Sequence, residues 1–587
     1  MESTQNRTEC DCKCTFKNEC NPQSLTCRIR NGRFYLLSAA FVIFAVSYIY
    51  CYFARTQFIR GAVVASVPEC AEIGGNIIEE GGSAVDAAIA AAFCNGVVMQ
   101  GNNGLGGGLS MMIHTQKEGD AKFLEARETA PWKSRRNMLT KGEIISGPLV
   151  VGVPGQLRGF AEAHKRYGVL KWKALIKPTI NLCEKGINVS KVLADDLQKY
   201  DLVIKKNEVL RNTFINPEHG STYKQGEILK LPLYAKTLRV ISKEGAEALY
   251  TGSLSKQFVK DINGLIDLED MAYYLPRWEE PYTGTLLNGE TFYSAGLPQS
   301  GILLTFIFNV LQGFLTRNPK LIKNWIRIVE TFKYAYGARP SLGDNPYLVK
   351  RVVDNLTSYS HAKYIRQHIY DNITFQNYDH YASTQLDSLE EPYSAYVCVI
   401  KSGDAVVLAS NLHHPWGAGY AAPHTGIVLN ALMLSFSKTC SRNQYTMPYS
   451  KANLIERGRR PLTPMSPTIV LDYRRSMKLV IGAVGGKKVL SVIAQVLLRA
   501  LWFNNTLHEA VEAPRLHHQV FPMTLMVEEN FTSYDNKLLK ALKKVGHEID
   551  FVSSNNFGGA LVIIKTTKGI QAVCDTRIPC SVYYVYS

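Results

Sequence analysis

The chain has 587 residues, of which 46% are hydrophobic and 20% are charged, a composition typical of a folded protein with a large core rather than a disordered one. The formal net charge is +16, but the basic residues are scattered, and the densest cluster is Arg457, Arg459 and Arg460. Because a nucleic-acid-binding surface gathers its basic residues into a patch or stripe, the sequence argues against a nucleic-acid partner.

An uncharged apolar run extends over Phe34–Phe53. A helix needs about 20 such residues to cross a bilayer, whereas a cleaved signal peptide has a shorter apolar region and a small-residue cleavage site. We therefore expect a transmembrane signal anchor, with a buried core helix as the alternative. Arg28, Arg30 and Arg33 precede the run, so the positive-inside rule predicts a single-pass type II protein. Residues 1–33 would form a cytoplasmic tail, and the rest would be an extracellular or lumenal ectodomain.

The cysteines fall into two groups. Those of the tail have no standard zinc spacing, and in a reducing cytosol they would be free thiols or, at Cys27, a palmitoylation site: Cys10, Cys12, Cys14, Cys20 and Cys27. In the predicted ectodomain, Cys70 with Cys94 and Cys574 with Cys580 are candidate disulfides, although counts alone do not fix connectivity.

Five glycosylation sequons lie beyond the predicted membrane span, which agrees with the predicted orientation. The candidate asparagines are Asn188, Asn355, Asn372, Asn504 and Asn530.

Helical and strand-like patterns alternate along the ectodomain. Residues 70–94 predict two helices, with Gly81-Gly82 ending the first and Ser83 capping an Ala-rich second. The glycine-rich segment 101–108 lacks the Lys-Ser/Thr of a phosphate-binding loop, so we interpret it as a site of close backbone approach. A strand is expected over residues 109–113.

A β-hairpin is predicted further along, from residues 395–400 and 404–409 around a short turn. Residues 479–481 then lead into the glycine-rich segment 482–486, which is followed by a helix over Val489–Phe503. This mixture of elements predicts a layered α/β or α+β domain.

Several sequence blocks, in this order, resemble the γ-glutamyltransferase (glutathione hydrolase) family from about Gly61 to Arg577. The blocks are Ala84–Cys94 with 104–108, the RETAP segment 127–131, VPGQLRG at 153–159, PQSG at 298–301, IVETFKYAY at 328–336, PLTPM at 461–465, GAVGG at 482–486 and EAPRLH at 512–517. A type II anchor and a disulfide like Cys70–Cys94 also resemble animal members of the family.

The resemblance implies an α+β fold, the four-layer αββα sandwich of N-terminal-nucleophile hydrolases. It also implies a large-subunit-like region, residues 61–393, and a small-subunit-like region, residues 394–587, which together form one ectodomain and can separate by self-cleavage into a heterodimer. The family chemistry requires neither a cofactor nor a metal, because the new N-terminal residue attacks a γ-glutamyl amide and its own α-amine acts as the base.

Part of the family's active site is retained. The resemblance places Ser394 at the position of the nucleophilic Thr and Arg127 at the position that binds the glutamyl α-carboxylate. Gly485 and Gly486 take the oxyanion positions. Thr463 retains one of two hydroxyls that contact the carboxylate.

Other positions are substituted. The family's Thr-x-Asn becomes Asn411-Leu412-His413, and the two acids that bind the substrate ammonium become Leu432 and Ser435. Lys487 replaces a Thr after the oxyanion glycines. The bulky Tyr393 stands before Ser394, where self-cleavage requires a tightly turned peptide.

These substitutions predict a glutathione-hydrolase-like ectodomain with weak or no activity, that is, a pseudoenzyme. The alternative is an active γ-glutamyl hydrolase or transferase that uses Ser394 after self-cleavage, on an altered substrate or on glutathione itself. The expected partners are a γ-glutamyl compound such as glutathione, or a related small anion, together with the membrane.

Overall fold

The computed structural model describes residues 41–47, 59–139, 146–382, 384, 394–438 and 450–586. The chain divides into two compact units, Met1–Phe58 with Ser587, and Ile59–Tyr586. In the first unit, residues 41–47 are helical, and the rest of the predicted span Phe34–Phe53 and the cysteine-rich tail lie outside the described residues. Within the described ranges, no helix combines the length and the apolar character needed to cross a membrane.

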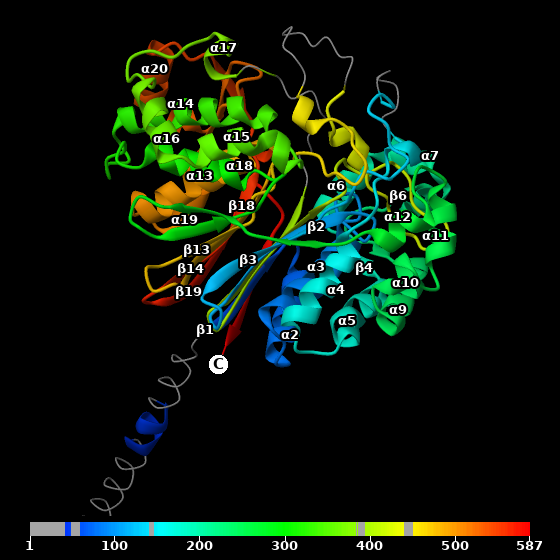
Figure 1. Ribbon diagram of the computed structural model, residues 1–587. Helices are drawn as coiled ribbons and strands as arrows, with labels where there is room; N and C mark the ends of the chain where they lie inside the picture. Colours follow the sequence, from blue (N-terminus) through cyan, green and yellow to red (C-terminus); the bar gives the residue numbers. More distant parts are fainter. Residues whose placement is uncertain are drawn as a thin grey trace, which may run out of the picture. The chain divides into compact units, whose positions relative to one another are not determined.

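Two antiparallel sheets form the centre of the second unit (Figure 1). The first sheet has the order β20 (Ser581–Tyr586), β1 (Ile59–Ala65), β11 (Ala395–Lys401), β12 (Asp404–Asn411), β2 (Gly108–Thr115), β3 (Asp120–Ala126) and β8 (Arg277–Glu279). The second sheet has the order β19 (Gly569–Cys574), β18 (Gly559–Thr566), β14 (Met477–Val484), β13 (Thr468–Leu471), β10 (Thr291–Ser294) and β9 (Tyr282–Thr285).

Helices cover the outer face of each sheet (Figure 1). The first group is α2 (Pro68–Glu79), α3 (Ala84–Val98), α4 (Gln156–Tyr167), α5 (Trp172–Lys185), α6 (Lys191–Lys199), α7 (Asp201–Lys206), α8 (Glu208–Phe214), α9 (Pro232–Glu244), α10 (Glu247–Tyr250), α11 (Ser255–Ile262) and α12 (Leu268–Tyr273). The second group is α13 (Gly301–Leu311), α14 (Ile322–Ala338), α15 (Pro346–Thr357), α16 (Tyr359–Gln367), α17 (Tyr378–Tyr381), α18 (Val489–Leu497), α19 (Leu507–Glu512) and α20 (Phe531–Lys544). The layers therefore follow the predicted αββα order.

Successive side chains along a strand point to opposite faces of the sheet, and the hydrophobic core therefore forms three clusters. On β11, Tyr396, Cys398 and Ile400 face the second sheet, while Val397 and Val399 face the helices. Because both faces are covered, the strand reads as a continuous apolar run rather than an alternating one. The predicted hairpin is confirmed, since β11 pairs with β12 in antiparallel register from Ala395–Ser410 to Lys401–Asp404.

The helix pair α2 and α3 forms as predicted. Ser83 Oγ accepts a hydrogen bond from Asp86 N, and the Asp86 carboxylate accepts one from Ser83 N, so the two residues make a capping box at the start of α3. All residues of α3 are buried, which its small side chains allow. A disulfide joins Cys70 to Cys94, and a second joins Cys574 to Cys580, so both predicted pairs are present.

The two predicted subunit-like regions share both sheets. β11 lies between β1 and the strand pair β12–β2, so segments from before and after Ser394 alternate across the first sheet. In the second sheet, β10 pairs with β13.

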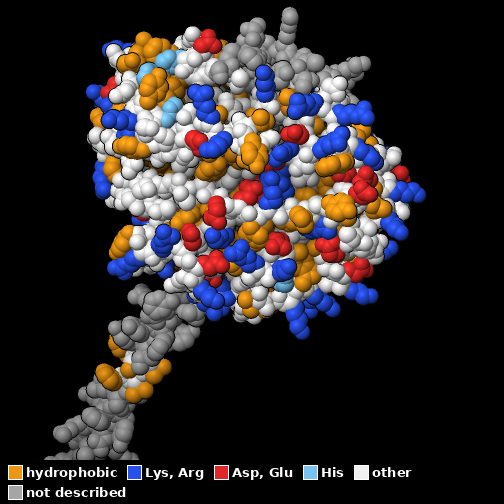
Figure 2. Space-filling view, viewed as in Figure 1, with side chains coloured by type: hydrophobic (Ala, Val, Ile, Leu, Met, Phe, Trp, Pro, Cys, Tyr) orange, Lys and Arg blue, Asp and Glu red, His pale blue; other side chains and the backbone are white. Residues whose placement is uncertain are grey.

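The Lys and Arg side chains are scattered over the visible face among acidic and apolar ones, without a basic stripe (Figure 2).

Candidate active site

Three strand ends position the predicted catalytic residues. Ser394 directly precedes β11, Asn411 is the last residue of β12, and Gly485 follows β14. The Ala395–Ser410 pair in the β-ladder puts Ser394 and Asn411 one step further along the same hairpin. Residues from both sheets therefore converge where the resemblance places the nucleophile and the oxyanion site.

Ser394 and Gly485 line the same cavity, which has a volume of about 340 Å³. Gly485 has a φ of +129°, and a β-carbon there would lie 2.7 Å from Gly558 Cα. Both the backbone conformation and the space require glycine at this position. The structure thus brings together two of the predicted site residues across the two sheets.

The lining of this cavity also includes ionisable side chains that were not identified from the sequence, among them Lys488 and Asp196. Burial lowers the pKa of Lys488, and the neighbouring charge of Lys487 lowers it further. Burial also raises the pKa of Asp196, on α6, to about 6. The only sequence signal for Lys488 was its place directly after the glycine segment, and nothing in the sequence indicated that α6 would reach this cavity.

Arg127 lies outside this cavity and is fully buried. Its Nη2 donates to the Pro461 carbonyl at 2.9 Å, and its Nε lies 3.4 Å from Glu125 Oε1. Burial alone would raise the pKa of Glu125, but the charges of Arg127 and Arg460 hold that pKa below its ordinary value. Arg127 Nη1 has no hydrogen-bond partner among the described residues, so one donor of the guanidinium is left over.

His413 lies at the centre of a buried chain of polar side chains. Its Nδ1 is 2.9 Å from Ser435 Oγ, and its Nε2 is 3.0 Å from Glu128 Oε2. The three residues come from three segments, the end of β3, the end of β12 and the 3₁₀ helix Leu432–Ser435, and each is at most 3% exposed. Glu128 belongs to the RETAP segment, but nothing in the sequence indicated that this residue contacts His413.

The segment that carries Leu432 and Ser435 is fixed by Asn430. The Asn430 side-chain amide donates to the carbonyls of Gly106 and Gly152, and its Oδ1 accepts from the backbone N–H groups of Gly152 and Leu432. Leu432 is buried completely. At the positions predicted to bind an ammonium group, the structure therefore holds an apolar side chain and a serine whose hydroxyl lies against His413.

Thr463 is also buried, and its hydroxyl takes part in a local turn. Thr463 Oγ1 accepts a hydrogen bond from Met465 N, while its carbonyl accepts from Ser300 Oγ at 2.9 Å. Ser300 belongs to the predicted block 298–301, so this block and the 461–465 block meet here.

Comparison with known proteins identifies the family and the fold of this chain. The sequence profile of the gamma-glutamyltranspeptidase family matches residues 70–584. The chain belongs to the gamma-glutamyltranspeptidase family. It is 35% identical over 522 residues to Scoloptoxin SSD14 of Scolopendra dehaani, covering 87% of this chain and 89% of that protein.

Glutathione hydrolases are similar over comparable lengths. The chain is 35% identical over 477 residues to the mouse (Mus musculus) Glutathione hydrolase 5 proenzyme, with 78% of this chain and 82% of that protein covered. It is 32% identical over 547 residues to human (Homo sapiens) Glutathione hydrolase 7, with 90% and 79% covered.

Solved structures support the fold assignment. A cephalosporin acylase from Bacillus halodurans superposes with a TM-score of 0.76 over 90% of this chain and 96% of that chain, at 24% identity, and so shows the shared fold. The gamma-glutamyltranspeptidase of Helicobacter pylori superposes with a TM-score of 0.50 at 31% identity, covering 53% of this chain and 92% of that chain. In this gamma-glutamyltranspeptidase-family chain, the αββα sandwich is therefore the scaffold of the Ser394–Gly485 cavity.

The five sequon asparagines are all exposed at the surface of the folded unit: Asn188, Asn355, Asn372, Asn504 and Asn530. Their accessibility meets the steric requirement for glycosylation, which remains a prediction.

Proposed function

We propose that this family member binds γ-glutamyl compounds such as glutathione poorly and hydrolyses them weakly or not at all. The observation that carries the proposal is the buried contact chain Glu128–His413–Ser435, with Leu432 beside it. Leu432 and Ser435 stand at the positions where the resemblance places the two acids that hold the substrate ammonium.

The energetic argument rests on two lost contacts. A hydrogen bond to a charged group contributes roughly 1.5–3 kcal/mol. Replacement of both acids by Leu432 and Ser435 would therefore cost a γ-glutamyl substrate about 3–6 kcal/mol, or on the order of 10²–10⁴ in affinity. The Glu128 carboxylate does not replace the two missing acids, because His413 Nε2 already lies 3.0 Å from it.

Arg127 supports binding of an anion, although it lies outside the Ser394–Gly485 cavity. Its Nη1 has no hydrogen-bond partner among the described residues and can donate to a carboxylate. A ligand with a carboxylate and without an α-ammonium would make this contact and would not need the two missing acids.

A second candidate function is hydrolysis or transfer by Ser394 after self-cleavage. The observation in its favour is the common cavity of Ser394 and Gly485. Such a reaction requires the nucleophile and the oxyanion donors to face the same space, and the shared lining by Ser394 and Gly485 supports this candidate.

Electrophoresis under denaturing conditions and a chromogenic γ-glutamyl anilide assay separate the two candidates. The first predicts a full-length band and no turnover above that of the Ser394→Ala variant. A C-terminal fragment that begins at Ser394, absent in Ser394→Ala, together with turnover would overturn it and support the second.

Restoring the acids tests the reason for the weak activity. The double variant Leu432→Glu/Ser435→Asp should bind a γ-glutamyl ligand more tightly than the wild-type chain, and the neutral Leu432→Gln/Ser435→Asn variant is its matched control. Equal binding by both variants would show that the missing charges are not the cause.

We also propose the location inferred from the sequence, a type II anchor over Phe34–Phe53 with the ectodomain outside the cytosol. Protease protection in sealed microsomes and a shift in mobility after glycosidase treatment test this orientation. An unglycosylated, protease-accessible ectodomain would contradict it.

A further inference from the structure

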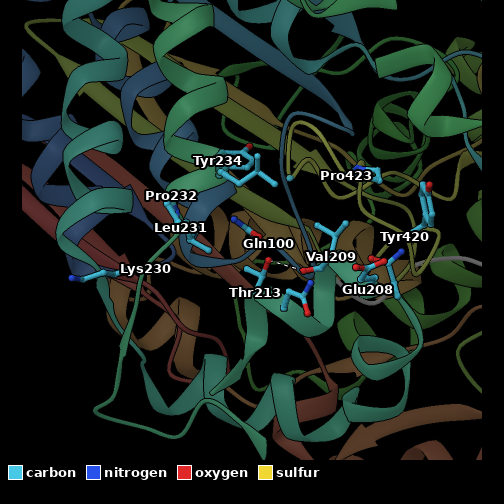
Figure 3. A pocket seen from close by; sticks show the side chains of 14 residues that line it. Gln100, Glu208, Val209, Thr213, Lys230, Leu231, Pro232, Tyr234, Tyr420 and Pro423 are labelled. Atoms are coloured by element: carbon cyan, nitrogen blue, oxygen red, sulfur yellow. Dashed lines mark hydrogen bonds between the residues drawn. The ribbon is translucent and has the colours of Figure 1, made fainter. Parts of the chain in front are cut away.

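A second cavity, about 570 Å³ in volume, lies on the helical side of the first sheet (Figure 3). It is bounded by α8, the start of α9, the loop around residues 420–426 and Gln100. It shares no lining residue with the Ser394 cavity, although Met99 and Asn102 on either side of Gln100 line that other cavity. It is therefore a separate space that adjoins the candidate active site through one chain segment.

Gln100 supplies an unused donor to this cavity. It is 3% exposed, and its Nε2 has no hydrogen-bond partner among the described residues. Figure 3 shows Gln100 between Tyr234 and Leu231 on one side and Val209 and Thr213 on the other. Because buried amide groups are nearly always hydrogen-bonded, this donor indicates an acceptor that occupies the cavity.

The first turn of α9 adds donors of a different kind. Leu231 is the N-cap of this 13-residue helix and provides no side-chain cap, and Pro232 has no N–H group. The amides of Leu233 and Tyr234 precede the first intrahelical bond of this helix, which Ala235 N makes to the Leu231 carbonyl. These residues line the cavity, so the positive end of the helix dipole acts on whatever binds there.

The rim carries a negative charge. Glu208 is exposed at the start of α8 and lines the cavity. Lys230 also lines the rim, but its side chain is directed away from the other labelled residues in Figure 3. The cavity thus offers hydrogen-bond donors at buried Gln100 and a carboxylate at exposed Glu208, with Val209 between these two residues in Figure 3.

We propose that this cavity binds a small zwitterion of the amino-acid or dipeptide class. The ligand carboxylate accepts hydrogen bonds from Gln100 Nε2 and the first-turn amides of α9, and its ammonium group lies near Glu208. This arrangement satisfies the unpartnered Gln100 donor and matches the polarity of the cavity from the buried end to the rim.

Calorimetric titration of the purified full-length chain tests the site with three probes, L-Ala-Gly, its C-terminal amide, and N-acetyl-L-Ala-Gly. None of them contains a γ-glutamyl group, so the result does not depend on hydrolysis. We expect saturable binding of Ala-Gly, with affinity about tenfold weaker for either probe that lacks one charge. Ala-Gly and its amide binding equally well would overturn the proposal, as would the absence of saturable binding at millimolar concentration, which is the result for a cavity that holds water alone.

Two variants locate the binding. Gln100→Leu removes the donor and should weaken Ala-Gly binding about tenfold, and Glu208→Gln, at an exposed position that folding tolerates, should weaken Ala-Gly but leave the N-acetyl probe unchanged. Asn556→Ala, in the lining of the Ser394 cavity, is the matched control and should have no effect. Unchanged affinity in Glu208→Gln, or a loss in Asn556→Ala as large as in Gln100→Leu, would contradict the assignment.

Discussion

Leu432 packs against Gly152 so closely that a β-carbon on Gly152 would lie 2.3 Å from Leu432 Cδ2 and 2.7 Å from Leu432 Cβ. The near approach of Leu432 Cβ means that a change of rotamer cannot relieve the contact. A position predicted to hold a substrate-binding acid is thus part of the packed core.

Gly152→Ala should therefore destabilise the chain by about 1–3 kcal/mol through overpacking. Leu432→Ala alone should also destabilise, because it leaves a cavity. The double variant should be less destabilised than the sum of the two, since Leu432→Ala removes Cγ and Cδ2 from the contact and leaves only the Cβ at 2.7 Å. Denaturant unfolding of all four chains measures this, and simple additivity would show that the two residues do not share one space.

The contact between His413 and Glu128 should make a large contribution to stability. His413→Leu leaves the buried Glu128 carboxylate without the imidazole nitrogen that lies 3.0 Å from it, and we expect a loss of about 3 kcal/mol in the free energy of unfolding. Replacing both residues, as His413→Leu/Glu128→Leu, should recover most of that loss. Thermal unfolding of the single and double variants decides the matter, and an equally unstable double variant would mean that shape rather than charge is responsible.

Gly485→Ala should be more harmful than an alanine at another glycine with positive φ. Gly485 has a φ of +129° and a close neighbour in Gly558, whereas Gly289, with a φ of +92°, has open space around its missing β-carbon. Backbone strain should cost about 1–3 kcal/mol at either position, and only Gly485→Ala should also displace the loop beside Ser394. Melting temperatures give the comparison, and equal losses would indicate that strain alone acts at Gly485.

The stability of the folded chain should decrease as the pH is lowered, in part because of His517. Burial lowers the pKa of His517 to about 3 in the folded chain, against 6.5 for an exposed histidine. Between those values the unfolded chain binds a proton that the folded chain does not, so the free energy of unfolding decreases as pH falls from about 6.5 to about 3. His517→Gln should reduce this slope, and His508→Gln, at an exposed position, should not. Denaturant midpoints at several pH values test this, and parallel profiles for wild type and His517→Gln would refute it.

Local chemistry explains why much of the fold was predictable. The Ser83–Asp86 capping box, the small residues of α3 and the apolar runs of β11 and β12 are each decided by nearby residues, and the structure contains them where the sequence placed them. Both disulfides were likewise among the candidates.

The candidate site was less predictable because its contacts join distant segments. Glu128 and His413 are 285 positions apart, and no pattern in either segment records that they meet. The same holds for Asp196 on α6, which reaches the Ser394 cavity only through the packing of the helical layer. The resemblance identified the two substituted positions. It could not show that Leu432 packs against Gly152 or that the Ser435 hydroxyl contacts His413.

The alternation of strands in the first sheet has a consequence for any experiment on a cut chain. β1 pairs with β11 on one side and with β20 on the other, so each piece of a chain broken before Ser394 would remain paired with the other along whole strands. The two pieces would migrate together in gel filtration and unfold as one body. A break at Ser394 is therefore invisible to native methods, and a chain judged intact by its native size has not been shown to be uncut.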